Sequence, residues 1–311
     1  MRRLLRSGST WRTLTVGMVW ACLLTACANP DDGAEGSVGK HTQDLLGEVV
    51  RDPAIAAKVP PEIARRGSFT AAVNPSSPPI KFIDDNGRIT GFTPQLIRAA
   101  GKLMGLKVVM QQTSFDALIP GLEAHRFDII LSINDLAERR EHTDFIDYLQ
   151  TGTAILGATT MSRSSVTPDT LCGLSVGYVR GNVQQNLVRA ASHKCVKAGA
   201  KPVSGSAFQD INAAILAVQS GQMDTAWGDA PSISYNAEKN PSRYKVLYRE
   251  ISGPYGVGIN KAQAGLRNAL HAALRKCVKD GIYQRLLKDY ALTDYALTKM
   301  PLNSGPADDG E

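Results

Sequence analysis

The sequence lacks several features that would assign it to a common functional class. It contains no series of long apolar segments, which excludes a multi-span membrane protein. Walker-type and Gly-x-Gly-x-x-Gly motifs are absent, so the chemistry that those motifs carry is not indicated. The five histidines have no metal-ligand spacing with one another or with the five cysteines, and we therefore expect no metal and no cofactor.

The composition fits an ordinary globular protein with two domains. The chain has 311 residues, of which 43% are hydrophobic, and about 150 residues per domain is typical. The chain has 35 Lys and Arg against 29 Asp and Glu. Four of the basic residues, Arg2, Arg3, Arg6 and Arg12, lie in the N-terminal segment 1–26, which contains no acidic residue. The rest of the chain has 31 basic against 29 acidic residues, so the positive charge does not indicate a nucleic-acid partner.

The N-terminal segment is typical of an export signal. Its basic start is followed by the short apolar stretch Leu14–Leu24 and then by Leu24-Thr25-Ala26-Cys27, which resembles the bacterial lipobox. As a helix this stretch would rise only ~16 Å, about half of the apolar core of a bilayer. We therefore predict a signal peptide over residues 1–26 and a lipid on Cys27 that anchors the protein to the outer face of the cell membrane. A plain signal peptide with an incidental cysteine and a twin-arginine export signal are the alternatives.

Two terminal segments contain many chain-breaking residues and little hydrophobic mass. We expect residues 27–58 to form a tether, with a short helix around Asp44–Arg51, because Pro, Gly and charged residues are mixed there. Residues 301–311 are rich in Pro, Gly and Asp and are expected to form a flexible tail.

Three cysteines remain in the folded part of an exported chain. Cys172 and Cys195 flank a stretch with strand and helix patterns, and we predict a disulfide bond between them because such pairs oxidise outside the cytoplasm. Cys277 continues an apolar helical stripe with Leu270 and Leu274, which favours a buried thiol.

Strand and helix patterns alternate through the middle of the chain. Short β-type runs are predicted at residues 69–73, 107–110, 128–131, 174–179, 225–227 and 255–259, with helical periodicity between them. This alternation predicts βαβ units and parallel sheets. The segments Leu122–Asp128 and Val218–Asp224 agree in residue class at most positions, which indicates two lobes of similar plan, with chance similarity as the alternative.

Polar residues follow the carboxyl ends of four predicted strands. They are Asn74, Ser132 with Asn134, Asn182 and Asp229. Ligands of open α/β sheets bind outside these strand ends, so we predict a ligand site in a cleft between the two lobes. Each residue taken alone would be explained as a turn residue or a helix cap.

A series of short motifs runs through about residues 60–295 with a specific spacing. They are Gly91-Phe92, Phe115–Leu122, Phe127-Asp128, Glu138-Arg139, Asp144-Phe145, Gly181–Gln184, Asp224–Asp229, Gly253–Gly256 and Asp280–Tyr283. This series resembles the family 3 extracellular solute-binding proteins of bacteria, which deliver polar amino acids to ABC importers. The lipobox and the positions of Cys172 and Cys195 resemble actinobacterial members in particular.

The resemblance implies an α/β fold of the periplasmic-binding-protein type II class. This fold is a clamshell of two lobes with parallel-rich sheets, joined by two crossover strands near Thr151–Ala158 and Tyr248–Ser252. Lobe 1 would comprise residues 59–152 plus 252–300, and lobe 2 residues 158–246. Such a protein would be a monomeric, non-enzymatic receptor that binds a small amino acid outside the cytoplasm and docks on an ABC transporter permease.

The resemblance also implies roles for individual residues. Arg139 matches the residue that binds the α-carboxylate of the ligand, and Asp229 matches the acid that receives the α-ammonium. The other matches are Ser132 and Asn134 for the head group, Asn182 and Val183 as the loop whose backbone N–H groups bind the carboxylate, and Phe115 as a wall over the side chain. Without the family spacing, Arg139 would be interpreted as a surface residue and Phe115 as a core residue.

Departures from the family pattern bear on specificity. Asn74 stands where cation-binding members have an acid, so we predict a neutral polar amino acid and no preference for lysine, arginine or histidine. Val183 replaces a threonine, and Ser77 stands where many members place an aromatic lid. Two other functions stay open: a sensor that reports the same ligand to a signalling partner, and an enzyme similar to cyclohexadienyl dehydratase, which would need Asp229 as its acid.

Overall fold

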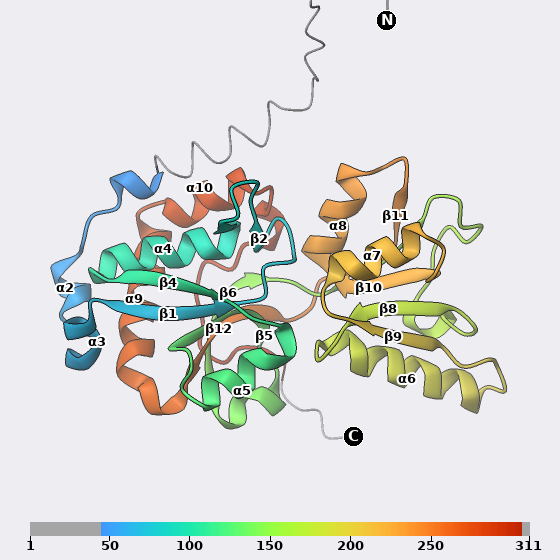
Figure 1. Ribbon diagram of the computed structural model, residues 1–311, viewed down its shortest axis with the longest axis horizontal. Helices are drawn as coiled ribbons and strands as arrows, with labels where there is room; N and C mark the ends of the chain where they lie inside the picture. The colour runs from blue at the N-terminus through green and yellow to red at the C-terminus, as the bar shows by residue number, and fades with distance from the viewer. Residues whose placement is uncertain (1–44, 307–311) are drawn as a thin grey trace, which may run out of the picture.

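The computed structural model describes residues 45–306, which form two lobes side by side (Figure 1). Lobe 1 contains a five-stranded sheet in the order β4-β1-β5-β12-β6, and lobe 2 contains one in the order β11-β7-β10-β8-β9. In each sheet three neighbouring strands are parallel and the remaining two are antiparallel to their neighbours. The two-lobed α/β arrangement predicted from the sequence is therefore confirmed.

Lobe 1 is built from both ends of the chain. Its strands are β1 (Ser68–Val73), β4 (Lys107–Gln112), β5 (Ile129–Asn134), β6 (Thr143–Gln150) and β12 (Pro254–Asn260), with the hairpin β2 (Phe82–Ile83) and β3 (Ile89–Thr90) beside them. Its helices are α2 (Pro53–Ala56), α3 (Pro61–Arg66), α4 (Phe92–Met104), α5 (Leu118–Glu123), α9 (Ala264–Lys279) and α10 (Ile282–Asp289). The apolar faces of α4, α9 and α10 pack together and supply much of the buried core.

Lobe 2 comes from the middle of the chain. Its strands are β7 (Thr153–Ala158), β8 (Ser175–Val179), β9 (Ser204–Phe208), β10 (Thr225–Asp229) and β11 (Tyr244–Glu250), and its helices are α6 (Val183–Lys197), α7 (Ile211–Gln219) and α8 (Ala230–Lys239). The predicted disulfide bond between Cys172 and Cys195 is present and ties the segment before β8 to α6. Cys277 is a free, buried thiol on α9, as predicted.

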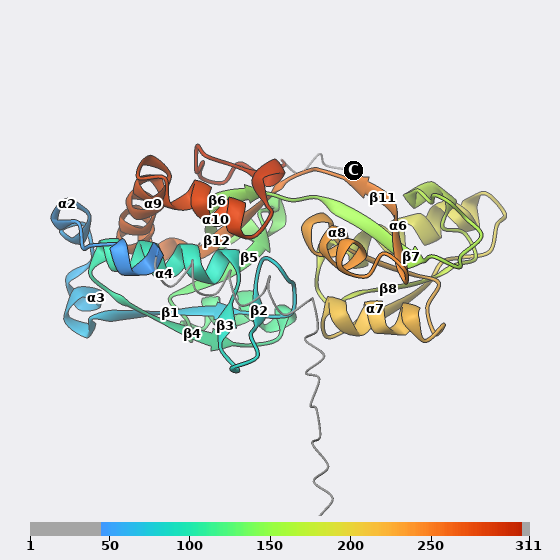
Figure 2. The ribbon, with the colours of Figure 1, turned by 90° about the horizontal axis from the view of Figure 1, so that it is seen from above.

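Two short crossings join the lobes, and Figure 2 shows both along one edge of the molecule. Residues 151–152 connect β6 to β7, and residues 251–253 connect β11 to β12. The crossings touch at Gly152, which has a φ of +122° and where a Cβ atom would lie 2.1 Å from the carbonyl oxygen of Glu250. Glycine is required there because no side chain fits. The predicted crossover Thr151–Ala158 is shorter in the structure, since residues 153–158 belong to the sheet of lobe 2.

The predicted internal repeat has the same hydrogen bonds in both lobes. In lobe 1 the Asp128 carboxylate accepts bonds from Thr70 N and Oγ1, and Asp128 N donates to the same hydroxyl. In lobe 2 the Asp224 carboxylate accepts bonds from Ser175 N and Oγ, and Asp224 N donates to that hydroxyl. Each motif links the helix-to-strand turn to the start of a neighbouring strand, which confirms that the lobes share one plan.

Two predicted boundaries need correction. Leu45 and Ile55 are buried in the core of lobe 1, so the predicted tether 27–58 is too long at its C-terminal end. Residues 301–306 are also part of lobe 1, because Leu302 pairs with Ile146 in a β-bridge and Ser304 donates two hydrogen bonds to Asp147. The signal peptide, Cys27 and the start of the tether lie outside the described residues. Within residues 45–306, no helix is both long enough and apolar enough to cross a membrane.

Candidate functional site

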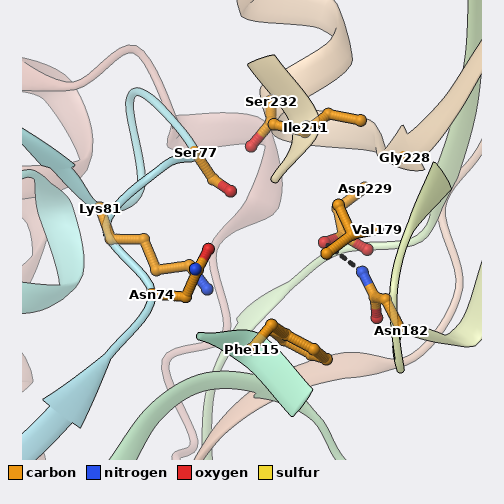
Figure 3. A pocket seen from close by; sticks show the side chains of 10 residues that line it. All are labelled: Asn74, Ser77, Lys81, Phe115, Val179, Asn182, Ile211, Gly228, Asp229 and Ser232. Atoms are coloured by element: carbon orange, nitrogen blue, oxygen red, sulfur yellow. Dashed lines mark hydrogen bonds between the residues drawn. The ribbon is translucent and has the colours of Figure 1, made fainter. Parts of the chain in front are cut away.

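A cavity lies between the two lobes, and residues from both of them line it (Figure 3). Lobe 1 contributes Asn74, Ser77, Lys81 and Phe115, and lobe 2 contributes Val179, Asn182, Ile211, Gly228, Asp229 and Ser232. The space open to the centre of a water molecule is about 10 Å³, which is room for about one water. Side chains of both lobes therefore face one small space.

Asp229 is the carboxylate of this cavity. It ends β10 and immediately precedes α8. One of its oxygens accepts hydrogen bonds from Tyr255 Oη and from Asn182 Nδ2 at 3.2 Å, and the other accepts one from Gln184 Nε2 at 3.0 Å. A carboxylate offers about four acceptor positions, so these three donors leave about one of them open.

Arg139 lies beside the cavity and not in it. Its guanidinium donates to the carbonyl oxygen of Asn134 at 3.0 Å and to that of Gly181, in lobe 2, at 3.3 Å. It also lies 5.9 Å from the centre of the Phe115 ring and lines a neighbouring groove of about 360 Å³. Burial lowers the pKa of Arg139, whereas Glu138 and Asp229 raise it. The structure therefore does not bring Arg139 and Asp229 into one cavity, although Phe115 lines both spaces.

The predicted backbone donors of lobe 2 are occupied within their own loop. Asn182 N donates to the carbonyl oxygen of Val179 at 3.1 Å. Val183 N donates to Asn182 Oδ1 at 2.8 Å, because Asn182 is the N-cap of α6. The side chain of Asn182 lines the cavity, whereas Val183 does not.

Ser132 and Asn134 have their side chains in the core of lobe 1. Ser132 has a φ of +53°, and its hydroxyl donates to Thr93 Oγ1 at 3.1 Å and accepts from Tyr148 Oη at 2.9 Å. Burial raises the pKa of Tyr148 well above its ordinary value, so this network stays uncharged. Asn134 has a buried side-chain oxygen without a hydrogen-bond partner among the described residues. The cavity lining includes neither residue, so the predicted hydroxyl contact of Ser132 is not supported by its geometry.

Lys81 is a cavity residue that the sequence analysis missed. Its side chain is 2% exposed, and Nζ donates to the carbonyl oxygen of Ser132 at 3.1 Å. Nζ also lies 5.6 Å from the Phe115 ring centre and 5.9 Å from that of Tyr255, distances typical of cation–π contacts. Burial lowers the pKa of Lys81 to about 8, and Asp229 opposes the shift. A lysine between apolar Ile80 and Phe82 was the only sequence signal.

Asn74, at the end of β1, lines the cavity as predicted. Its Oδ1 accepts a hydrogen bond from Ser76 Oγ at 2.5 Å, and its Nδ2 approaches the carbonyl oxygen of Thr113 at 3.4 Å. In the part of the chain that the structure describes, no group of three or more His, Cys, Asp or Glu side chains is arranged to hold a metal ion. The polar groups of the cavity therefore suit a small ligand that carries its own charges.

Two lobes joined by two crossings, with a charged cavity between them, define the class of two-lobed solute receptors. The family model of the bacterial extracellular solute-binding proteins, family 3, matches residues 69–293. The chain belongs to this family, and its fold is the periplasmic-binding-protein type II fold.

Known relatives agree with this assignment. The arginine-binding protein ArgT of Corynebacterium glutamicum is 31% identical over 264 residues, which cover 83% of this chain and 86% of that protein. An ancestral arginine-binding protein solved with arginine is 26% identical, with a TM-score of 0.65 over 72% of this chain and 98% of that one. An ancestral amino-acid-binding protein that is a precursor of cyclohexadienyl dehydratase is also 26% identical, with a TM-score of 0.67 over 74% of this chain and 97% of that one.

Proposed function

We propose that this protein is an extracytoplasmic amino-acid receptor, anchored through a lipid on Cys27, that delivers its ligand to the permease of an ABC importer. The observation that carries the proposal is the open acceptor position of Asp229 in an interlobe cavity. The family and the names of the relatives support an amino acid as the ligand. The export signal and lipobox of residues 1–27 support the location.

Asp229 and Arg139 would bind opposite ends of the amino acid. The α-ammonium would take the fourth acceptor position of Asp229 in lobe 2. Arg139 would exchange its bond to Gly181 for two bonds to the α-carboxylate, which suits the planar fork of a guanidinium. Because the two residues belong to different lobes, only a closed form satisfies both ends of the ligand. The ligand therefore binds the closed form more tightly than the open form, and this difference in affinity shifts the equilibrium towards closure.

The side chain of the ligand carries no positive charge in this proposal. The sequence predicted a neutral ligand because Asn74 replaces an acid, and the structure adds the buried ammonium of Lys81 on the same wall of the cavity. A cationic side chain there would meet a like charge at low dielectric, which is unfavourable. The arginine bound by the relatives is therefore not the ligand that we propose for this chain.

A receptor role suits Asp229 better than catalysis. Its three hydrogen-bond partners all donate to it, and this arrangement fits a carboxylate that accepts bonds. A dehydratase needs a group that gives up a proton to its substrate. We therefore propose no catalytic step.

A thermal-shift screen of the twenty amino acids tests the proposal. A ligand of about ten heavy atoms that contributes roughly −0.8 kcal/mol per atom binds with about −8 kcal/mol, or a Kd near 1 μM. At about 1,000 times that Kd the folded state gains about 4 kcal/mol, which is a clear rise in Tm. If no amino acid raises the Tm at millimolar concentration, the proposed function is wrong.

A further inference from the structure

Lys81 is a buried cation with no role in the proposed complex so far. Asp229 and Arg139 bind the ammonium and the carboxylate of the ligand, and Lys81 contacts neither group. An ammonium has three donors, yet Lys81 Nζ makes one hydrogen bond, to the carbonyl oxygen of Ser132. Within residues 45–306 it forms no ion pair, although its side chain is only 2% exposed. A buried charge without a charged partner is unfavourable, so the cavity has a place for an anion.

The turn that carries Lys81 is held in place by backbone contacts. Ser77 and Lys81 exchange two backbone hydrogen bonds, of 2.8 and 3.0 Å, and Thr93 N in the first turn of α4 donates to the carbonyl oxygen of Ile80 at 3.0 Å. Gly91 allows this approach, because a Cβ atom there would lie 2.6 Å from the same oxygen. Lys81 is thus fixed in the cavity before a ligand arrives, which lowers the entropic cost of binding.

Lys81 would stay without an anionic partner if the ligand had a neutral side chain. In the proposed complex Asp229 pairs with the α-ammonium of the ligand, and Arg139, which lines the neighbouring groove, pairs with its α-carboxylate. The cavity lining includes no carboxylate besides Asp229, and the acids Asp116, Glu123 and Glu138 line the groove. An anion for Lys81 must therefore come from the side chain of the ligand.

We propose that the ligand is an α-amino acid whose side chain ends in a carboxylate and that Lys81 is the specificity-determining residue that binds this group. The inference rests on the proposed function and goes further by naming the substrate class. Asn74 and Ser77 lie on the same wall of the cavity and add uncharged hydrogen-bonding groups beside Lys81 (Figure 3).

The chemistry of Lys81 distinguishes the three kinds of side chain. Its pKa of about 8, lowered by burial, leaves it mostly protonated at pH 7, and a bound carboxylate would stabilise that form. An amide would accept a hydrogen bond but leave the charge unbalanced. A guanidinium or ammonium side chain would be repelled.

Calorimetry with the wild-type protein at pH 7 gives the first test, using glutamate, aspartate, glutamine, asparagine and arginine. We expect one of the two acids to bind at least about 30-fold more tightly than its own amide, and arginine to show no binding. If an amide or arginine binds as tightly as the acids, the inference is wrong.

Variants of Lys81 give the second test. In Lys81→Met the affinity for the acid should fall by about 100-fold, while the affinity for the amide changes by less than about 5-fold, so the preference is lost. If the Met variant does not fold, Lys81→Gln, which keeps a hydrogen-bond donor, replaces it in the same measurement. The matched control is Lys102→Met, on the exposed face of α4. Equal losses for acid and amide would overturn the role of Lys81.

The two proposals fail in different ways. If none of the twenty amino acids binds, the proposed function fails and the inference fails with it. If a neutral or cationic amino acid binds tightly and the acids do not, the receptor function stands and the inference alone is wrong.

Discussion

Replacing Asp229 with asparagine removes one negative charge from the cavity with almost no change in shape. Asp229 accepts three hydrogen bonds, from Tyr255, Asn182 and Gln184. An asparagine has one side-chain oxygen with two acceptor positions, so at least one of these donors loses its acceptor. That loss alone should reduce the free energy of unfolding by about 1–2 kcal/mol.

The effect on binding should be larger than the effect on stability. Removing one member of a buried, hydrogen-bonded ion pair typically costs about 3–5 kcal/mol. At about 1.4 kcal/mol per tenfold change, Asp229→Asn should weaken the binding of the amino acid by about 100- to 3,000-fold. The side chain would also stop opposing the lowered pKa of Lys81, so Lys81 should titrate at a lower pH.

Calorimetry with two ligands isolates the ammonium contact. The first is the amino acid that binds best in the screen, and the second is the same molecule without its α-amino group. The variant should lose affinity for the first and not for the second. Asp224→Asn, at the other end of β10 and outside the cavity lining, is the matched control. An equal loss for both ligands would mean that Asp229 does not contact the ammonium.

Three further predictions follow from contacts in the structure. Arg139→Ala should weaken amino-acid binding by about 100-fold or more, and a loss below tenfold in calorimetry would exclude its role at the carboxylate. The disulfide closes a loop with a sequence separation of 23, so Cys172→Ala with Cys195→Ala should lower the free energy of unfolding in urea by about 3 kcal/mol; a change below about 1 kcal/mol would contradict this. Burial, with a contribution from Asp135, raises the pKa of Asp147 from 3.8 to about 7. Because the folded state then holds this proton more tightly than the unfolded state, the free energy of unfolding should fall as the pH rises from 4 through 7. In Asp147→Asn the difference between the free energies of unfolding at pH 5 and pH 8 should be smaller.

The periodicity of the sequence predicted six strands, and each of them is present. Two of the strands that it missed, β6 and β9, lack a clear strand pattern for physical reasons. β6 contains Asp144 and Asp147, which are buried because distant residues satisfy them: Arg267 for the first and Ser304 for the second. A local pattern carries no information about partners more than 100 residues away. β9 (SGSAF) consists mainly of small residues and has little apolar signal.

The site was predicted in part. The ends of parallel strands led to Asn74, Asn182 and Asp229, and all three line the cavity. Ser132 was expected just past a strand end, but β5 continues to Asn134. Ser132 lies within the strand with a φ of +53°, and its hydroxyl is in the core of lobe 1. The direction of a side chain at a strand end depends on this local geometry, which the residue type does not encode.

The shared plan of the lobes explains how the cavity obtains two opposite charges. The helix-to-strand motif at Asp128 precedes β5 in lobe 1, and the motif at Asp224 precedes β10 in lobe 2, whose far end reaches the cavity. At the end of β10 the chain places the carboxylate of Asp229 itself. Near the end of β5 the backbone carbonyl of Ser132 holds the ammonium of Lys81, which comes from another segment of the same lobe. One strand therefore carries the negative group, and the equivalent strand of the other lobe accepts a hydrogen bond from the positive group. A ligand with an ammonium and a side-chain carboxylate satisfies both, whereas a ligand with only one of them leaves a buried charge without a partner.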